Sequence, residues 1–291
     1  LTSDVLAIRG APIASLARLR SAAWKSAHAL FLVYYLPPQL ALNLPQLQFA
    51  YLFRLGIPLP FLPSPLAPYC GPNCRDYRRP SPPTPPTASS RGKPARPGKP
   101  IPPDHYLRLH LPRAIHHLAC GKRLTLNRHN QLVTLIEKAI NQYRSAHSAN
   151  QLNLASSLNS QRHVDLWVLS SSALPFRLGA DATVHVPDLP SYVDAAAVDP
   201  ATVFQRLSDA KDTEHLPDAV AGAYSFLAIV FSVYGGIGPP PAHQYLRDIF
   251  SDRLVTELAA GGKGNDTAHL AHLFFAHLQA SMFRSCTHMA L

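Results

Sequence analysis

The stretch PPPAHQYLRDIFSDRL, residues 239–254, predicts a helix, and the prediction of the fold class starts from it. Its prolines suit the first turn of a helix, where a missing N–H costs nothing and the fixed φ is already helical. Gly261 can close such a helix as a C-cap. Between them, apolar side chains recur at helical spacing, namely Tyr245, Leu246, Ile249, Phe250, Leu254 and Leu258. We therefore predict one amphipathic helix from Pro241 to about Gly261.

The rest of the C-terminal region carries further helix signals. Asp199 followed by Pro200 is typical of a helix start. Pro217 predicts the start of a second helix, which would end at Gly235 and Gly236. Asp266 predicts the cap of a last helix that runs to about Phe283. Residues 199–291 are therefore expected to form four helices joined by turns.

The two predicted helix pairs also resemble each other in sequence. PATVFQR (200–206) and PAHQYLR (241–247) share Pro-Ala, an aromatic residue and Arg at a distance of 41 residues, counted on the sequence. AYSF (223–226) and AHLF (271–274) align in the second helix of each pair. A repeat of roughly 40 residues with two helices per unit is typical of an α-solenoid. We therefore expect a mainly α fold with solenoid-like helical hairpins.

These repeats resemble those of a known class of proteins. LNLPQLQFAYLFRLG (42–56) and PPPAHQYLRDIFSDRL, followed by NDTAHLAHLFFAHL (265–278), are similar to the octotricopeptide and heptatricopeptide repeats of organellar RNA-associated proteins. The resemblance covers residues 199–283 best. It implies a helical fold, association with organellar RNA and, by analogy with related chains, a place in a mitochondrial ribosome. It transfers no RNA-reading side chain to this sequence.

The positive charge is concentrated in the first third of the chain. Residues 1–103 hold 12 Lys and Arg but only two acids, whereas residues 104–291 hold 15 of each sign. Because prolines keep the backbone extended and cations near phosphates release counterions, a basic proline-rich extension over 67–103 favours a polyanion. The expected RNA-binding residues are Arg75, Arg78, Arg79, Arg91, Lys93, Arg96 and Lys99.

These patterns divide the chain into four regions. They are an apolar helical segment (1–66), the basic arm (67–103), a helical middle region (104–198) and the helical-repeat region (199–291). Within them, a helix is expected from Pro12 onward and another over about 127–146, whereas 181–198 is expected to be a loop. No run of alternating strands is predicted.

An apolar stretch near the N-terminus raises the question of a membrane. Residues 26–53 contain no charged side chain, but three prolines interrupt the run and no apolar piece reaches the roughly 20 residues that a span needs. We therefore favour buried helices over a transmembrane helix. Contact of residues 26–66 with lipid or an apolar partner stays open. The alternative function that follows is an accessory subunit of a mitochondrial inner-membrane complex, such as ATP synthase or a respiratory complex.

Motifs for catalysis or cofactor binding are missing from the sequence. There is no nucleophile elbow, P-loop or dinucleotide-binding glycine pattern. Cys70 and Cys74 lack a second cysteine pair, and His116 and His117 are better explained as surface or phosphate-neighbouring groups. The histidines of the last predicted helix, His269, His272 and His277, are better explained as a polar or partly buried helix face than as metal ligands. We predict no catalytic residue, no metal, no cofactor and no small-molecule substrate, and thus no enzyme.

Taken together, the sequence predicts a non-catalytic structural component of a mitochondrial ribosome. The arm would bind rRNA, and the helical repeats would bind neighbouring ribosomal proteins. The Arg-rich, acid-poor residues 1–25 suit either the remainder of an organelle-targeting region, and thus a mitochondrial location, or an ordinary basic helix. A free factor acting on an organellar transcript is a third hypothesis, but it would need a basic repeat surface, and residues 199–291 hold nine acids against six basic residues.

Overall fold

The computed structural model describes eight parts of the chain, which are residues 13–23, 38, 41–55, 122–144, 147–150, 164–170, 177–189 and 191–290. The basic arm, 67–103, and all seven of its predicted RNA-binding residues lie outside these described residues. The pair His116 and His117 also lies outside them. Their predicted roles therefore stay predictions.

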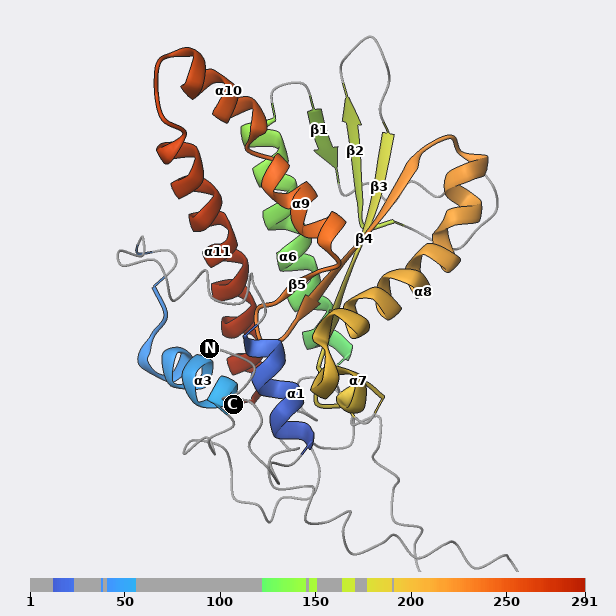
Figure 1. Cartoon of the computed structure of the whole chain (residues 1–291), viewed down its shortest axis with the longest axis vertical. Helices are drawn as coiled ribbons and strands as arrows, with labels where there is room; N and C mark the ends of the chain where they lie inside the picture. Colours follow the sequence, from blue (N-terminus) through green and yellow to red (C-terminus); the bar gives the residue numbers. More distant parts are fainter. Residues whose placement is uncertain are drawn as a thin grey trace, which may run out of the picture.

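A five-stranded mixed sheet forms the centre of the described structure (Figure 1). The strands follow one another in chain order across the sheet, and their bounds are β1 (His147–Asn150), β2 (Leu166–Ser170), β3 (Arg177–His185), β4 (Ser225–Ser232) and β5 (Ile237–Gly238). Pairing is antiparallel except between β3 and β4, which run parallel. A parallel pair needs a crossover connection, and two helices between residues 193 and 221 provide it.

Helices complete the fold and make up most of the described residues. Their bounds are α1 (Ile13–Ala22), α3 (Leu44–Leu55), α6 (Lys122–Tyr143), α7 (Val193–Val198), α8 (Pro200–Ala221), α9 (Pro240–Asp248), α10 (Ser251–Ala259) and α11 (Asn265–Ala290). In Figure 1, α6 and α11 lie to the left of the sheet and α8 to its right. The prediction of a mainly α fold is confirmed for the described residues.

The main core lies between the sheet and the helices α6, α9 and α11. Leu132, Ile136 and Ile140 recur along one face of α6 and are all fully buried. They pack in the same cluster as Phe231 of β4 and Phe283 of α11. Burying such side chains contributes roughly 1.5–3 kcal/mol each, so this shared core fixes α6 and α11 against the sheet.

Helix α1 is joined to the sheet domain by a buried polar network. The Arg18 guanidinium donates to Asp188 Oδ2 through Nη2 at 2.7 Å and through Nε at 3.1 Å. The Tyr234 hydroxyl donates to the same carboxylate oxygen at 2.7 Å. Arg18 is 3% exposed and Tyr234 is fully buried. The N-terminal helix is therefore part of the folded core rather than an appendage to it.

Several predicted helices are confirmed with adjusted bounds. Asp199 caps α8 by accepting from the Ala201 N–H at 3.0 Å, and Pro200 takes the first helical position. The helix expected over 127–146 is α6, and the last predicted helix is α11. The helix expected from Pro241 to Gly261 is divided into α9 and α10, with Ile249 and Phe250 between them buried in the core.

The prediction of a helical hairpin repeat over 199–283 is wrong for its second helix. Pro217 lies inside α8, and residues 225–232 form strand β4. The run SFLAIVFS holds six apolar residues between two serines; β4 is paired on both sides, and its last five residues are buried. The residues described between 191 and 290 therefore form no α-solenoid.

Two further expectations for the middle of the chain are also wrong. The predicted loop over 181–198 contains the end of β3 and the whole of α7, and strands are present although none was predicted. The sheet joins the predicted middle and repeat regions, because β3 from the first pairs with β4 from the second. Among the described residues, no helix is both long and apolar enough to cross a membrane.

Candidate metal centre

Two aspartates meet where β2 begins. Asp165 directly precedes β2, and Asp181 lies within β3. Because Leu166 pairs with Ala180, the strand register brings Asp165 to the height of Asp181. The N–H of Ala182 donates to Asp165 Oδ2 at 2.7 Å, which holds this carboxylate against β3. Sheet pairing thus places two acidic side chains of neighbouring strands side by side.

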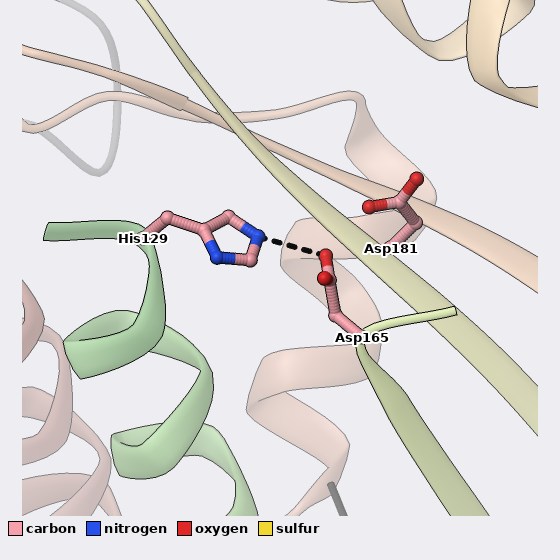
Figure 2. Close-up of side chains that lie close together, drawn as sticks. All are labelled: His129, Asp165 and Asp181. Atoms are coloured by element: carbon pink, nitrogen blue, oxygen red, sulfur yellow. Dashed lines mark hydrogen bonds and ion pairs between the residues drawn. The ribbon is translucent and has the colours of Figure 1, made fainter. Parts of the chain in front are cut away.

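A histidine from α6 completes the cluster (Figure 2). Nε2 of His129 lies 2.8 Å from Asp165 Oδ2, and Nδ1 lies 3.0 Å from the side-chain oxygen of Asn130. Both ring nitrogens thus face acceptors, which is the arrangement that a doubly protonated imidazolium satisfies. His129 and Asp165 are about equally accessible, with 22% and 23% of their side chains exposed.

Two side chains of α8 contact the second aspartate. Lys211 Nζ lies 2.8 Å from Asp181 Oδ2, and the Nε2 of His215 lies 2.9 Å from the same oxygen. They are four residues apart, so they lie on one face of the helix. His215 is buried and its ring stacks on Phe226 of β4 at a centroid distance of 4.7 Å. The cluster therefore joins α6, β2, β3 and α8.

The electrostatics of the cluster follow from burial and from the closeness of like charges. Burial raises the pKa of Asp181, and the neighbouring Asp165 carboxylate raises it further, to about 7, although Lys211 opposes this change. Burial alone would lower the pKa of His129, but the hydrogen bond to Asp165 outweighs it and raises that pKa to about 9. Burial also lowers the pKa of His215, which favours a neutral ring that donates to Asp181.

The geometry of His129, Asp165 and Asp181 suits one metal ion. Each offers a ligand atom, and these three atoms lie within 4.8 Å of one another. Octahedral ligands at about 2.1 Å from a Mg²⁺ ion are themselves about 3–4 Å apart, so a small adjustment of the side chains would let one ion bridge all three. The two carboxylate oxygens suit Mg²⁺ or Mn²⁺, and the imidazole also suits Zn²⁺ or Fe²⁺.

The candidate metal centre consists of residues that the sequence analysis did not select, and the prediction of no metal stays a prediction. None of His129, Asp165, Asp181, Lys211 or His215 was predicted to have a role. The sequence did contain a signal for the two aspartates, because the short apolar runs at 164–169 and 178–186 each contain one aspartate. Recognising both runs as strands would have predicted that the two carboxylates are neighbours.

The histidines predicted on the last helix are not brought together as a metal site. His269 and His272 of α11 are exposed, and His277 is half-buried against α6. Of the four cysteines, only Cys286 lies among the described residues, where it is a free, buried thiol. Cys70 and Cys74 lie outside them, so the prediction that they bind no metal stays a prediction.

Comparisons of this chain with protein-family models, with curated proteins and with solved structures gave no match.

Proposed function

We propose that this protein is an RNA-associated component of an organellar ribonucleoprotein, in which the folded domain holds a phosphodiester through a divalent cation at Asp165, Asp181 and His129. The observation that carries the proposal is the convergence of two carboxylates and an imidazole at one end of β2. A cation bound by carboxylates keeps open positions that water or phosphate oxygens can fill.

The surroundings of the cluster support a phosphate ligand. Lys211 brings an ammonium group within 2.8 Å of Asp181, so a second positive charge lies beside the cation position. It is 28% exposed and so remains accessible to a ligand from solvent. A cation with an adjacent lysine is the pairing that binds phosphate in many protein sites, because both neutralise its charge.

The protonation of the cluster adds a measurable property. At neutral pH, the His129 ring is doubly protonated, because its pKa is raised to about 9, and Asp181, with a pKa of about 7, is about half protonated. A metal ion must displace protons from its ligands, so its binding releases them and its affinity increases with pH.

The cation site is tested by titrating Mn²⁺ into the full chain and following free Mn²⁺ by electron paramagnetic resonance, with Mg²⁺ as competitor. Asp165→Asn and Asp181→Asn keep the shape of each side chain but remove its charge, and we expect each to weaken Mn²⁺ binding about tenfold or more. Asp194→Asn, at an exposed position of α7, is the matched control and should bind like the wild type. Equal Mn²⁺ binding by all four proteins would refute the site.

RNA binding is tested separately with a fluorescent single-stranded RNA in Mg²⁺ and in EDTA. We expect Mg²⁺ to tighten binding to the wild type and to have little effect on Asp165→Asn. Retention of intact RNA is the expected result, in line with a non-catalytic role. Shortened RNA products that require Mg²⁺ and Asp165 would instead make the protein a nuclease.

A second observation, the charge distribution, supports membership in a mitochondrial ribosome. All of the net positive charge falls in residues 1–103, and seven of those cations lie between Arg75 and Lys99. Such an arm would bind rRNA, while the folded domain would contact neighbouring ribosomal proteins. Neutralising the cations of residues 75–99 should reduce the salt dependence of binding.

This second proposal is tested by centrifuging mitochondrial extracts through a sucrose gradient with and without RNase. We expect the chain to migrate with a ribosomal particle and to leave it after RNase treatment. Migration with a detergent-solubilised inner-membrane complex, unaffected by RNase, would refute the proposal and favour the accessory-subunit alternative.

A further inference from the structure

The Asp181 carboxylate already has a cationic partner from its own chain. Lys211 Nζ lies 2.8 Å from Asp181 Oδ2. The aspartate side chain is 7% exposed and the lysine side chain is 28% exposed, so the lysine covers part of the carboxylate and is itself reached by solvent. A divalent cation that approaches Asp181 therefore meets this ammonium group at the carboxylate.

The side chains of the cluster also balance one another in charge. The carboxylates of Asp165 and Asp181 face the His129 ring and the Lys211 ammonium, respectively, at 2.8 Å in both pairs. A bound divalent cation adds two positive charges to this balance, and positive charges that share a partly buried carboxylate repel one another. Because a protonated lysine has no lone pair to offer an ion, Lys211 competes with the cation for Asp181 instead of helping to bind it.

Of the two α8 side chains on Asp181, Lys211 rather than His215 is placed to leave the carboxylate. His215 is 3% exposed and its ring stacks on Phe226 at 4.7 Å, so packing holds it in position. Lys211 has a long unbranched side chain, and a second carboxylate is near it, because Glu214 Oε2 lies 3.3 Å from Lys211 Nζ. Glu214 is 44% exposed, so the lysine has an alternative partner on the solvent side of the cluster.

We propose that Lys211 is a built-in competitor of the divalent cation, and that the cation displaces it and so makes it available to phosphate. Before the cation binds, the ammonium occupies Asp181. After the cation binds, the ammonium turns to Glu214 and to the phosphate oxygens of the RNA strand that the cation holds. This inference rests on the proposed function, because it describes how the same site is regulated.

Such an exchange couples the binding of the cation to the binding of the phosphate. A phosphate that draws the Lys211 ammonium away from Asp181 removes the competitor of the cation, and therefore tightens cation binding. By linkage, the cation tightens phosphate binding by the same factor. The phosphate thus favours the cation-bound state in two ways, through coordination of the ion and through its contact with Lys211.

A purely structural role of Lys211 makes a different prediction. If its ion pair only joined α8 to β3, removing the charge would disturb Asp181 and weaken the binding of both the cation and the phosphate. A competitor that also binds phosphate gives changes of opposite sign when its charge is removed, because the cation loses a rival and the phosphate loses a partner. The signs of the two changes therefore separate the two roles.

The test replaces Lys211 in the full chain with Met and with Gln, which remove the charge, and with Arg, which keeps it. Mn²⁺ binding is followed by electron paramagnetic resonance without RNA, and we expect both neutral variants to bind Mn²⁺ about tenfold more tightly than the wild type. Lys211→Arg should bind Mn²⁺ no more tightly than the wild type. Lys263→Met, in the exposed turn between α10 and α11, is the matched control and should leave Mn²⁺ binding unchanged.

The phosphate side of the exchange is measured with a short fluorescent single-stranded RNA in saturating Mg²⁺ and in EDTA. The ratio of the two affinities cancels the contribution of the basic arm. We expect the factor by which Mg²⁺ tightens RNA binding to fall about threefold or more in Lys211→Met and Lys211→Gln, and to stay unchanged in Lys263→Met. A ratio that is unchanged in both neutral variants would overturn the role of Lys211 toward phosphate.

The Mn²⁺ results distinguish a failure of this inference from a failure of the cation site. Mn²⁺ binding by the wild type that neither neutral variant tightens would overturn the inference and leave the cation site in place. Mn²⁺ binding by none of the proteins would refute the cation site, and the inference with it. Binding by the neutral variants alone would support Lys211 as the competitor and refute cation binding by the wild type.

Discussion

Replacing Arg18 with Met should strongly destabilise the protein. Arg18 is 3% exposed and its partner Asp188 has 1% of its side chain exposed. Met keeps much of the length of the arginine side chain but removes its charge, so Asp188 would be left as a buried carboxylate without its cation. Breaking a buried ion pair in this way costs about 3–5 kcal/mol.

Two further variants separate the contributions of the tyrosine hydroxyl and of the unpaired charge to this cost. Tyr234→Phe removes the 2.7 Å hydrogen bond that Tyr234 donates to Asp188 and the 3.1 Å hydrogen bond that it accepts from Arg18 Nε, and it should cost about 1.5–3 kcal/mol, the usual range for a bond to a charged group. Replacing both charges, in Arg18→Met with Asp188→Leu, leaves no unpaired charge and should cost much less than Arg18→Met alone. The double variant therefore separates the ion pair from the packing of α1.

The free energy of unfolding is measured by urea denaturation with circular dichroism, and the melting temperature serves as a check. A loss of 3–5 kcal/mol corresponds to a decrease of about 6–20 °C for a domain of this size. Burial already raises the pKa of Asp188, so an Asp188 without Arg18 would take up a proton more readily, and the cost of Arg18→Met should shrink as the pH falls toward 5.

Arg206→Met, which removes an exposed arginine of α8, is the matched control and should change stability by less than about 0.5 kcal/mol. A cost for Arg18→Met that is no larger than this control would mean that α1 does not dock through Asp188. A double variant as unstable as the single one would show that packing, rather than the unpaired charge, dominates.

Three other predictions concern the cluster and the core. Because the pKa of His129 is raised to about 9 in the folded protein, its stabilisation is complete below about pH 6.5 and is lost as the pH rises through 9. Urea denaturation should thus give a free energy of unfolding that is about 1–3 kcal/mol lower at pH 10 than at pH 7, and His129→Gln should abolish this difference. An equal difference in the variant would show that other groups cause it. Gly238→Ala places a Cβ 2.7 Å from the Phe204 ring in the core, so thermal denaturation should reveal a cost of about 1–3 kcal/mol, and a change below about 0.5 kcal/mol would contradict this packing. Cys286 is fully buried, and burial raises the pKa of its thiol. In a variant whose other cysteines are replaced by serine, we therefore expect a thiol reagent to react with Cys286 only in denaturant. Rapid reaction of the native protein would contradict its buried position.

Some local helix signals in this sequence were sufficient to predict the helices that they begin, although the predicted start at Pro217 lies inside α8. Asp199 and Pro200 start α8 as expected, because a cap and a first-turn proline act within a few residues of each other. The i, i+4, i+8 spacing of Leu132, Ile136 and Ile140 likewise marked the buried face of α6. These features depend on neighbours in the chain, which the sequence displays directly.

Strand β4 could not be recognised in the same way. Its run of apolar residues has neither the alternation of a half-buried strand nor a clear helical period, because both of its edges are paired and its side chains are buried on both faces. The similarity between AYSF and AHLF then favoured a helix. A short shared pattern of Ala and aromatic residues was too weak to establish the repeat.

The candidate metal centre was missed for a different reason. Asp165 and Asp181 are 16 residues apart in the sequence, and His129 lies 36 residues before Asp165. No spacing rule connects such residues, because their closeness comes from the register of β2 on β3 and from the packing of α6. The site is thus a property of the sheet, and it could be predicted only after the strands were known.

The parallel pairing of β3 with β4 also determines the order in which this domain can form during synthesis. When β3 leaves the ribosome, its partner β4 has not yet been made, because α7 and α8 come between them in the chain. One edge of β3 therefore stays unpaired, and Asp181 stays without Lys211 and His215, until α8 and β4 follow. Such a delay exposes hydrogen-bonding backbone that can pair with other chains. We expect the nascent domain to depend on chaperones most strongly between the synthesis of His185 and that of Ser232.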